Sequence, residues 1–142
     1  MKTTLNIAIA FVILAGVVAV RTNAQTAGAH KVVANIPFEF SVGKATLPAG
    51  RYTITVINPT SDRKILRIRQ VEGRASAMVI TTDVAGNVSD DAKLVFHRYG
   101  DRHYFAQAQM AGDATGLAAV KSRSEKKQAV ATTKKIVVLT AG

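Results

Sequence analysis

Residues 93–110, KLVFHRYGDRHYFAQAQM, decide the fold of this chain. Two segments rich in aromatic and aliphatic residues flank the pair Gly100-Asp101. A glycine followed by an aspartate suits a two-residue type II′ turn, whose twist matches that of the strands it joins. The stretch therefore predicts a β-hairpin with strands at about 93–99 and 103–110.

The hairpin register separates the two histidines of this stretch. With a two-residue loop, His97 pairs with Tyr104 and Arg98 pairs with His103, and directly paired residues share a face. His97 and His103 then point to opposite faces and cannot bind one metal ion. A three-residue loop would bring them to one face, but the sequence has no glycine where that loop prefers one. We therefore expect no metal, no cofactor and no histidine catalysis.

Outward from the hairpin, apolar residues alternate with polar ones in a pattern typical of short strands. Glycine- or proline-containing turns separate the strands, and residues 83–92 form the longest polar loop of the sheet region. Residues 111–120 are too rich in Gly and Ala to predict a strand. The expected strands cover about 36–42, 45–47, 52–56, 65–71, 75–82, 93–99, 103–110 and 134–140.

One helix interrupts this pattern near the C-terminus. Ser122 and Glu125 have the spacing of a capping box, which predicts a short helix over about 123–131. Seven or eight strands with turns every 8 to 12 residues predict an all-β fold. We expect a single antiparallel β-sandwich, with a small closed β-barrel as the alternative.

The N-terminus predicts export. Lys2 precedes an apolar run from Leu5 to Val20, and the small residues Thr22 and Ala24 follow. This is the order of a secretory signal peptide, so we expect cleavage after Ala24, or alternatively after Ala29. An uncleaved anchor is the remaining possibility, because the run approaches the length that spans a bilayer.

The expected domain organisation is a signal peptide at 1–24 and one β-domain at 25–142, located in the periplasm or outside the cell. After cleavage no membrane span is expected. The chain has no cysteine, which excludes disulfides, thiol nucleophiles and a lipid-modified N-terminal cysteine. The exported domain must therefore be stabilised by its packing alone.

Four motifs together resemble a group of small, uncharacterised exported β-proteins of acidobacterial-type soil bacteria. They are Ile36 to Gly43 (IPFEFSVG), Leu47 to Tyr52 (LPAGRY), Leu94 to Phe105, and Lys121 to Glu125 (KSRSE). The resemblance covers most of the exported part. It implies an exported β-domain and carries no assigned activity.

Positive charge is the clearest hint of a ligand. Without Lys2 and Arg21 the chain has 17 basic and 9 acidic residues, a formal charge of +8. Such an excess favours anionic polysaccharides or other envelope polyanions, or else serves solubility alone. The chain has no Trp, and its basic clusters contain no aromatic residue for stacking on bases, so specific nucleic-acid recognition is not expected. The candidate polyanion-binding residues are Arg63, Lys64, Arg67, Arg69, Arg74, Lys121, Arg123, Lys126, Lys127, Lys134 and Lys135.

Three other interpretations remain open. The chain could be a structural subunit of an extracellular fibre or matrix, self-associating by pairing of edge strands. A hydrolase is the enzymatic alternative, although Glu39, Glu72 and Glu125 are all expected to be exposed and form no catalytic pair. Finally, tyrosines and phenylalanines, among them Tyr99 and Tyr104, could line a ligand groove instead of the core. We expect a non-enzymatic binding domain.

Overall fold

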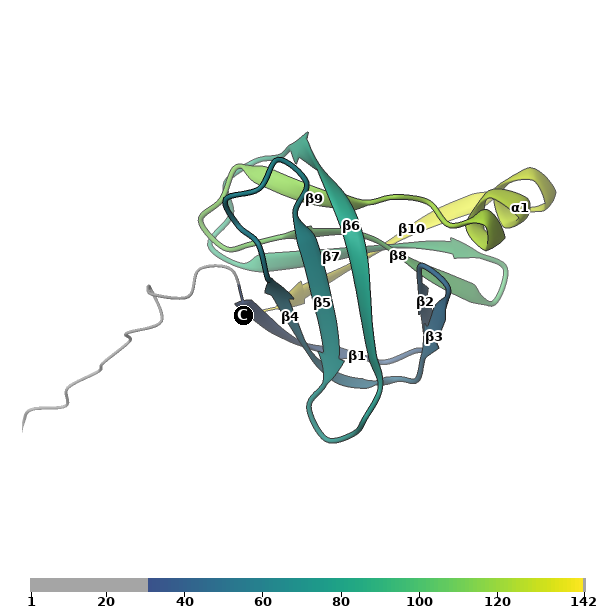
Figure 1. Cartoon of the computed structure of the whole chain (residues 1–142). Helices are drawn as coiled ribbons and strands as arrows, with labels where there is room; N and C mark the ends of the chain where they lie inside the picture. Colours follow the sequence, from purple (N-terminus) through teal and green to yellow (C-terminus); the bar gives the residue numbers. More distant parts are fainter. Residues whose placement is uncertain (1–30, 142) are drawn as a thin grey trace, which may run out of the picture.

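A computed structural model describes residues 31–141 (Figure 1). The predicted signal peptide and both of its cleavage sites lie outside the described residues. The described part forms ten strands and one helix: β1 (Lys31–Ile36), β2 (Phe40–Val42), β3 (Ala45–Leu47), β4 (Gly50–Val56), β5 (Ile65–Gln70), β6 (Ser76–Ala85), β7 (Ala92–Tyr99), β8 (Arg102–Gln109), β9 (Thr115–Ala119), α1 (Arg123–Ala131) and β10 (Lys134–Ala141).

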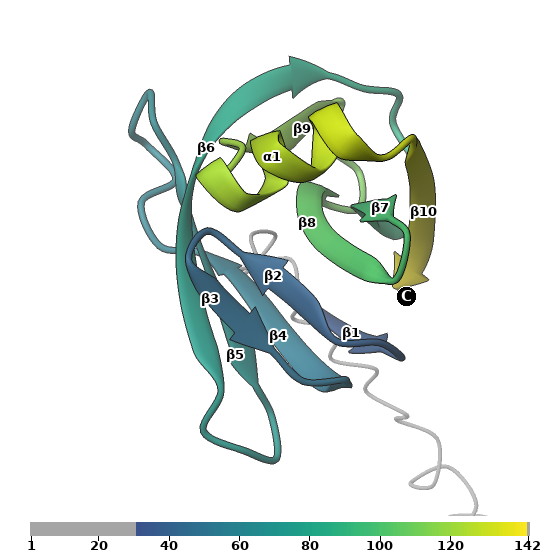
Figure 2. The same cartoon turned by 90° about the vertical axis from the view of Figure 1, so that its right-hand side faces the viewer.

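The strands form one continuous, strongly bent sheet. Its hydrogen-bonded path runs β1-β4-β5-β6-β9-β8-β2-β3, and β7 joins β8 to β10. The first half of β6 pairs with β5 and the second half with β9. Figure 2 shows β6 arching from the side that holds β1, β4 and β5 to the side that holds β7, β8 and β10.

The expected all-β class with one late helix is confirmed. The sheet is not closed into a barrel, because no ladder joins β1 to β10 within residues 31–141. The pairing is antiparallel except at one point, where Ser41 on β2 pairs in parallel with Tyr104 on β8. The prediction of a wholly antiparallel fold is wrong at that bridge.

The strand count of seven or eight is also wrong, for two physical reasons. The expected strand at 36–42 is interrupted at Pro37, which has no N–H to donate to a ladder: β1 begins at Lys31 and ends at Ile36, and β2 begins only at Phe40. The segment expected to lack a strand contains β9, which bridges β6 and β8. A Cβ atom on Gly116 would lie 2.4 Å from Gln107 Nε2, so small residues allow this close approach.

The hairpin that decides the fold forms as predicted. Tyr99 pairs with Arg102, Arg98 with His103, and His97 with Tyr104. A type II′ turn requires a positive φ at its first central residue and a negative φ at its second. Gly100 has a φ of +61°, and Asp101 does not have a positive φ. Farther along, the register shifts between Val95 and Phe96, which is a β-bulge.

The core lies between the two sides of the bent sheet. Phe40, Tyr52, Phe96 and Phe105 meet there edge to face, with ring centroids 5.1 to 5.7 Å apart. The hydroxyl of Tyr52 donates to the carbonyl of Pro48 at 2.6 Å, so this fully buried tyrosine leaves no polar atom unpaired. Burial raises the pKa of Tyr52 above its ordinary value of 10.0.

Candidate functional site

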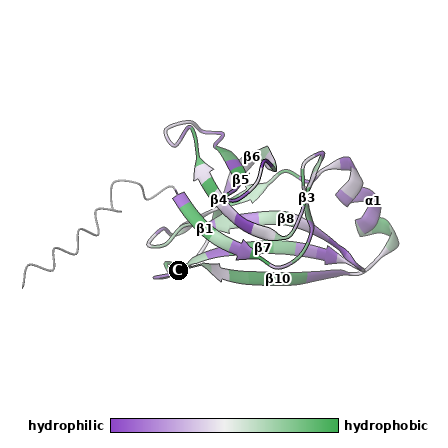
Figure 3. Cartoon of the chain, turned by 90° about the horizontal axis from the view of Figure 1, so that it is seen from below, coloured by the Kyte–Doolittle hydropathy of each residue, from purple (hydrophilic) through white to green (hydrophobic). Residues whose placement is uncertain are grey.

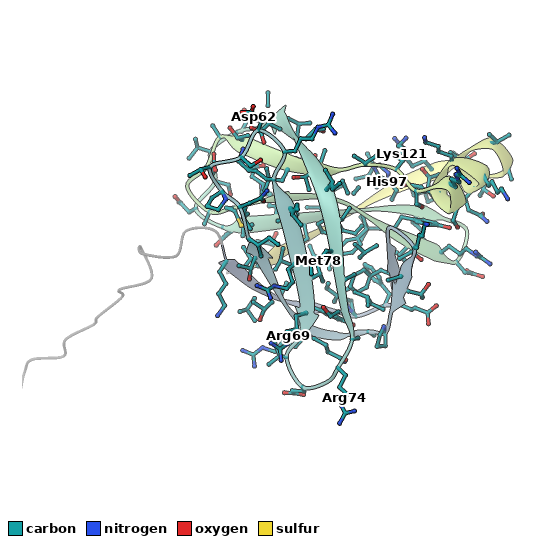
Figure 4. All side chains as sticks on the ribbon, viewed as in Figure 1. Asp62, Arg69, Arg74, Met78, His97 and Lys121 are labelled. Atoms are coloured by element: carbon teal, nitrogen blue, oxygen red, sulfur yellow. The ribbon has the colours of Figure 1, made fainter. Side chains whose placement is uncertain are left out.

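Two separate surfaces hold most of the predicted basic residues. Arg67 and Arg69 are exposed on β5, and Arg74 lies in the loop that follows it. The second group surrounds α1 at the other end of the molecule, where Figure 4 places Lys121 far from Arg69 and Arg74. This group comprises Lys121, Arg123, Lys126, Lys127, Lys134 and Lys135.

Two of the predicted residues belong to neither surface. The ammonium group of Lys64 lies 2.9 Å from both carboxylate oxygens of Asp83, so its charge is already compensated. Asp83 was expected in a loop but lies in β6, which extends to Ala85. Arg63 lies in the loop between β4 and β5, where the side chain of Asn58 donates to its carbonyl. Neither basic residue contributes to a shared basic surface.

The predicted helix has the predicted bounds and cap. Ser122 is the N-cap, and its hydroxyl accepts from the backbone N–H of Glu125 at 3.1 Å. This contact satisfies one of the backbone donors that the first turn of a helix leaves without a partner. The sequence therefore determines where α1 begins and which way its first turn faces.

The position of Glu125 is the main surprise of the site, because the prediction that it is exposed is wrong. It is only 3% exposed, and its Oε1 lies 2.7 Å from Nδ1 of His97. The hydroxyl of Tyr99 donates to the same oxygen at 3.2 Å. Beside them, the hydroxyls of Tyr104 and Ser124 lie 2.9 Å apart. Polar contacts thus fix α1 onto the face of the hairpin that is turned away from the core.

These contacts explain the properties of the buried tyrosine. Burial, together with the adjacent Glu125 carboxylate, raises the pKa of Tyr99 above its ordinary value of 10.0. Tyr99 therefore stays protonated at neutral pH and keeps donating to Glu125. A signal for this arrangement exists in the sequence: the register places His97, Tyr99 and Tyr104 on one hairpin face, where their polar tips need partners.

Burial of Glu125 leaves the outer surface of α1 without an acid. Glu125 is the sole acidic residue of the helix, while Arg123, Lys126 and Lys127 are exposed. Figure 3 accordingly shows hydrophilic segments along α1 and at the start of β10. The helix thus presents positive charge outward and uses its negative charge for anchoring.

A cleft of about 670 Å³ opens at the N-terminus of α1. Its three basic residues come from three elements: Lys44 from the turn between β2 and β3, Arg102 from the start of β8, and Arg123 from α1. Gly43 and four hydroxyl side chains complete the lining, namely Ser41, Thr46, Ser122 and Ser124. Lys44 and Arg102 were not predicted, because neither belongs to one of the two basic clusters of the sequence.

Two acidic residues line a neighbouring cleft that shares Arg102 with this one. Arg102 also borders a smaller cleft of about 250 Å³ that Glu39 and Asp101 help to line. Neither carboxylate comes within 4.0 Å of a basic group in the described part of the chain, where the two ion pairs are Lys64–Asp83 and His97–Glu125. The three cations of the larger cleft are therefore available to an anionic ligand.

The histidines lie as the hairpin register predicts, on opposite faces. His103 stacks on Phe38 with ring centroids 3.9 Å apart, whereas His97 contacts Glu125. Burial, with a contribution from Arg98, lowers the pKa of His103 below its ordinary value of 6.5. Among residues 31–141, no three His, Cys, Asp or Glu side chains are grouped closely enough to hold a metal ion.

The interpretation of the aromatic residues as a ligand groove is wrong. Tyr52, Phe96 and Phe105 are buried in the core, and Tyr99 and Tyr104 are buried beneath α1. The two tyrosines under the helix pack edge to face, with centroids 5.7 Å apart. These five aromatic side chains are therefore buried by packing and do not form an open groove.

Comparison with protein-family models, with curated proteins and with solved structures gives no significant match. In the part of the chain that the structure describes, no helix has the length and apolar character needed to cross a bilayer.

Proposed function

We propose that this protein is an exported, non-enzymatic β-domain that binds polyanionic glycans through the surface around α1. The observation that carries the proposal is the convergence of Lys44, Arg102 and Arg123 on one cleft. Three uncompensated cations held close together repel one another in the free protein, so a bound anion stabilises the arrangement.

The cleft suits a single sugar unit that carries an acidic group. Its volume of about 670 Å³ lies in the range of small-molecule sites. The guanidinium groups of Arg102 and Arg123 can each make two parallel hydrogen bonds to a sulfate, phosphate or carboxylate. The serine and threonine hydroxyls supply donors and acceptors for the sugar hydroxyls. The backbone N–H groups at the start of α1 add partial positive charge.

The lysines outside the cleft extend the site along a polymer. Lys121, Lys126 and Lys127 lie on or beside α1, and Lys134 and Lys135 begin β10. A chain with one acidic group per repeat can occupy the cleft with one unit and approach these lysines with its neighbours. Because such contacts are electrostatic, the binding weakens as salt is added.

The N-terminal sequence supports a location for this activity outside the cytoplasm. We propose that residues 1–24 direct export and that the mature protein acts in the periplasm or outside the cell, where acidic glycans occur. Its resemblance to exported bacterial proteins supports this placement. Mass spectrometry of the protein recovered from the exporting cell tests it: a mature N-terminus at Gln25 or His30 is expected, and retention of Met1 would contradict cleavage.

We propose that the bent sheet is a β-sandwich. β6 passes from one side of the core to the other, and the inner faces of both sides supply the core. In sandwiches and barrels alike, ligand-contacting groups commonly lie in turns and ends that a rigid sheet positions.

Binding to heparin or polygalacturonate in a salt gradient tests the proposed function. The unmodified protein should stay bound well above about 100 mM NaCl, where the screening length is roughly 10 Å. A Lys44→Gln/Arg102→Gln/Arg123→Gln variant should elute much earlier. The control is Arg51→Gln/Arg67→Gln/Arg69→Gln, which removes the same charge from another surface and should elute nearly unchanged. Equal losses in both variants would show that net charge alone governs retention and overturn the proposed site.

A structural subunit is the second candidate, and the edge strands favour it. β1 and β10 each have one ladder partner in the described residues; the two strands also contact each other, and Ile136 on β10 is 62% exposed. Unpaired edges can add a strand from another copy. Sedimentation at rising concentration decides: assembly into large species supports the subunit, and a monomer throughout excludes it.

A further inference from the structure

The outer face of β1, β4, β5 and β6 is a second surface with its own composition. The register aligns its side chains in rows across the strands. One row contains Lys31, Thr55, Arg67 and Met78; the next contains Val33, Thr53, Arg69 and Ser76. We call these residues, with Arg51, Ile57, Val71 and Ile80, the outer sheet face.

Four basic residues lie on β1, β4 and β5 of the outer sheet face. Lys31, Arg51, Arg67 and Arg69 are all exposed, and the rows contain no acidic residue. Lys31, Arg67 and Arg69 border a shallow depression of about 480 Å³ that also exposes Thr53 and Thr55. Like charges this close on one sheet face destabilise the free protein. An anionic partner relieves that repulsion.

Exposed apolar side chains lie beside these charges. Met78 is 62% exposed and Ile80 is 49% exposed, and both lie on β6 beside Arg67 and Ile65. Val33, Ile57 and Val71 are exposed along the neighbouring strands. In Figure 4 Met78 lies near the middle of the sheet, between the ends marked by Asp62 and Arg74. The face thus combines positive charge with apolar groups that no described segment covers.

We propose that the outer sheet face docks on an anionic lipid bilayer. Charge complementarity selects a negative partner, and each Lys or Arg close to such a membrane gains from its surface potential. The exposed apolar side chains select a bilayer over a soluble polyanion. Met78 and Ile80 can enter the boundary between headgroups and acyl chains, while arginines and lysines keep their charged ends at the headgroups.

The proposal uses none of the residues of the α1 cleft. It is therefore independent of glycan binding, and either can fail while the other holds.

Cosedimentation with lipid vesicles tests the docking surface. The full chain is expressed, recovered as the exporting cell processes it, and mixed with vesicles of phosphatidylglycerol and phosphatidylcholine in equal parts. Binding should be strong to these vesicles and weak to phosphatidylcholine alone. Arg67→Gln/Arg69→Gln should lower the affinity by about 30-fold, because each cation at an anionic surface contributes roughly fivefold.

A second variant isolates the apolar contribution. Met78→Ser/Ile80→Ser should lower vesicle affinity by roughly tenfold or more without changing any charge. The matched control for the arginine variant is Lys126→Gln/Lys127→Gln on α1, which removes the same charge and should bind vesicles normally. Circular dichroism and thermal unfolding check that each variant is folded. If the double variant Met78→Ser/Ile80→Ser unfolds, the single variant Met78→Ser replaces it, because the side chain of Met78 is largely exposed.

Three results would overturn the proposal. Equal binding to neutral and anionic vesicles would remove the role of charge. Normal vesicle binding by the folded Met78→Ser/Ile80→Ser variant would show that the face meets only soluble polyanions. Equal losses in the arginine variant and the α1 control would show that net charge, and not this face, drives binding.

Discussion

The α1 surface and the outer sheet face both carry clustered positive charge, yet they are built differently. Around α1, a helix anchored by a buried carboxylate positions cations from three elements at one cleft. On the outer sheet face, β1, β4 and β5 hold the cations in rows beside exposed apolar side chains. The first arrangement suits a ligand that enters a concavity, and the second suits an extended partner surface.

The comparison shows that net charge alone is a poor guide to a ligand. Both surfaces contribute to the same formal excess of +8, and the sequence places both in one class of candidate polyanion sites. The two surfaces differ in the groups that lie next to the charges. Hydroxyl groups and a helix N-terminus lie beside the cations of the cleft, and the exposed side chains of Met78 and Ile80 lie beside those of the outer sheet face.

Removing the buried carboxylate should have the largest effect. Glu125→Ala leaves His97 and Tyr99 without their shared acceptor and should lower the free energy of unfolding by about 3 kcal/mol. Because α1 loses its anchor, this variant should lose glycan binding, whereas its vesicle binding should stay nearly normal as long as the sheet is folded. Asp83→Asn is the control, because its exposed pair with Lys64 contributes about 1 kcal/mol or less. Equal destabilisation by the two substitutions in urea unfolding would contradict the anchoring role.

The second largest effect should be the different salt dependence of the two binding affinities. If three cations contact a linear polyanion, affinity for heparin should fall roughly 40-fold between 50 and 200 mM NaCl, by analogy with counterion release from nucleic acids. Affinity for anionic vesicles should fall less steeply, because salt does not screen the contribution of Met78 and Ile80. Titrations of both ligands at four salt concentrations measure the slopes. Identical slopes would mean that the apolar side chains take no part.

Loss of the helix cap should have an intermediate effect confined to one surface. Ser122→Ala removes the acceptor of the Glu125 N–H and should cost about 1 kcal/mol of stability. It should also weaken heparin binding, since Ser122 lines the cleft, and leave vesicle binding unchanged. Ser76→Ala on the exposed outer sheet face is the matched control and should change stability by less than about 0.5 kcal/mol. Unfolding curves and both binding assays report the outcome.

The smallest effect concerns a histidine that belongs to neither surface. Burial lowers the pKa of His103 below 6.5, so the unfolded chain binds its proton more readily than the folded one. The stabilising contribution is therefore complete above about pH 6.5 and declines as the pH falls through the lowered pKa. His103→Phe, which keeps the stack on Phe38, should flatten the loss of stability between pH 7 and pH 5. Parallel profiles for the two proteins would contradict this assignment.

How much the sequence could predict depends on the range of the interactions involved. The type II′ hairpin and the bounds of α1 depend on neighbouring residues such as Gly100 and Ser122, and both were predictable. β9 was not predictable, because small residues favour no local structure. Their role is visible only in the fold, where Gly116 packs closely against Gln107. Burial of Glu125 was missed for a similar reason, since its partners lie more than 25 residues away.

The cleft was the least predictable feature of the candidate site. Of its three cations, only Arg123 belongs to a basic cluster in the sequence, whereas Lys44 and Arg102 reach it through the β2–β8 contact. Charge clusters along the chain thus reveal a surface such as the β5 face, where alternate residues share a side. They do not reveal a site assembled from distant segments.

The central claim, that two basic surfaces serve two different ligands, is tested most directly by one crossed binding measurement. The Lys44→Gln/Arg102→Gln/Arg123→Gln and Arg51→Gln/Arg67→Gln/Arg69→Gln variants, which carry the same net charge, are each titrated with heparin and with phosphatidylglycerol vesicles. We predict that the first variant loses heparin binding and keeps vesicle binding, and that the second does the reverse. Losses of equal size in all four titrations would contradict the claim.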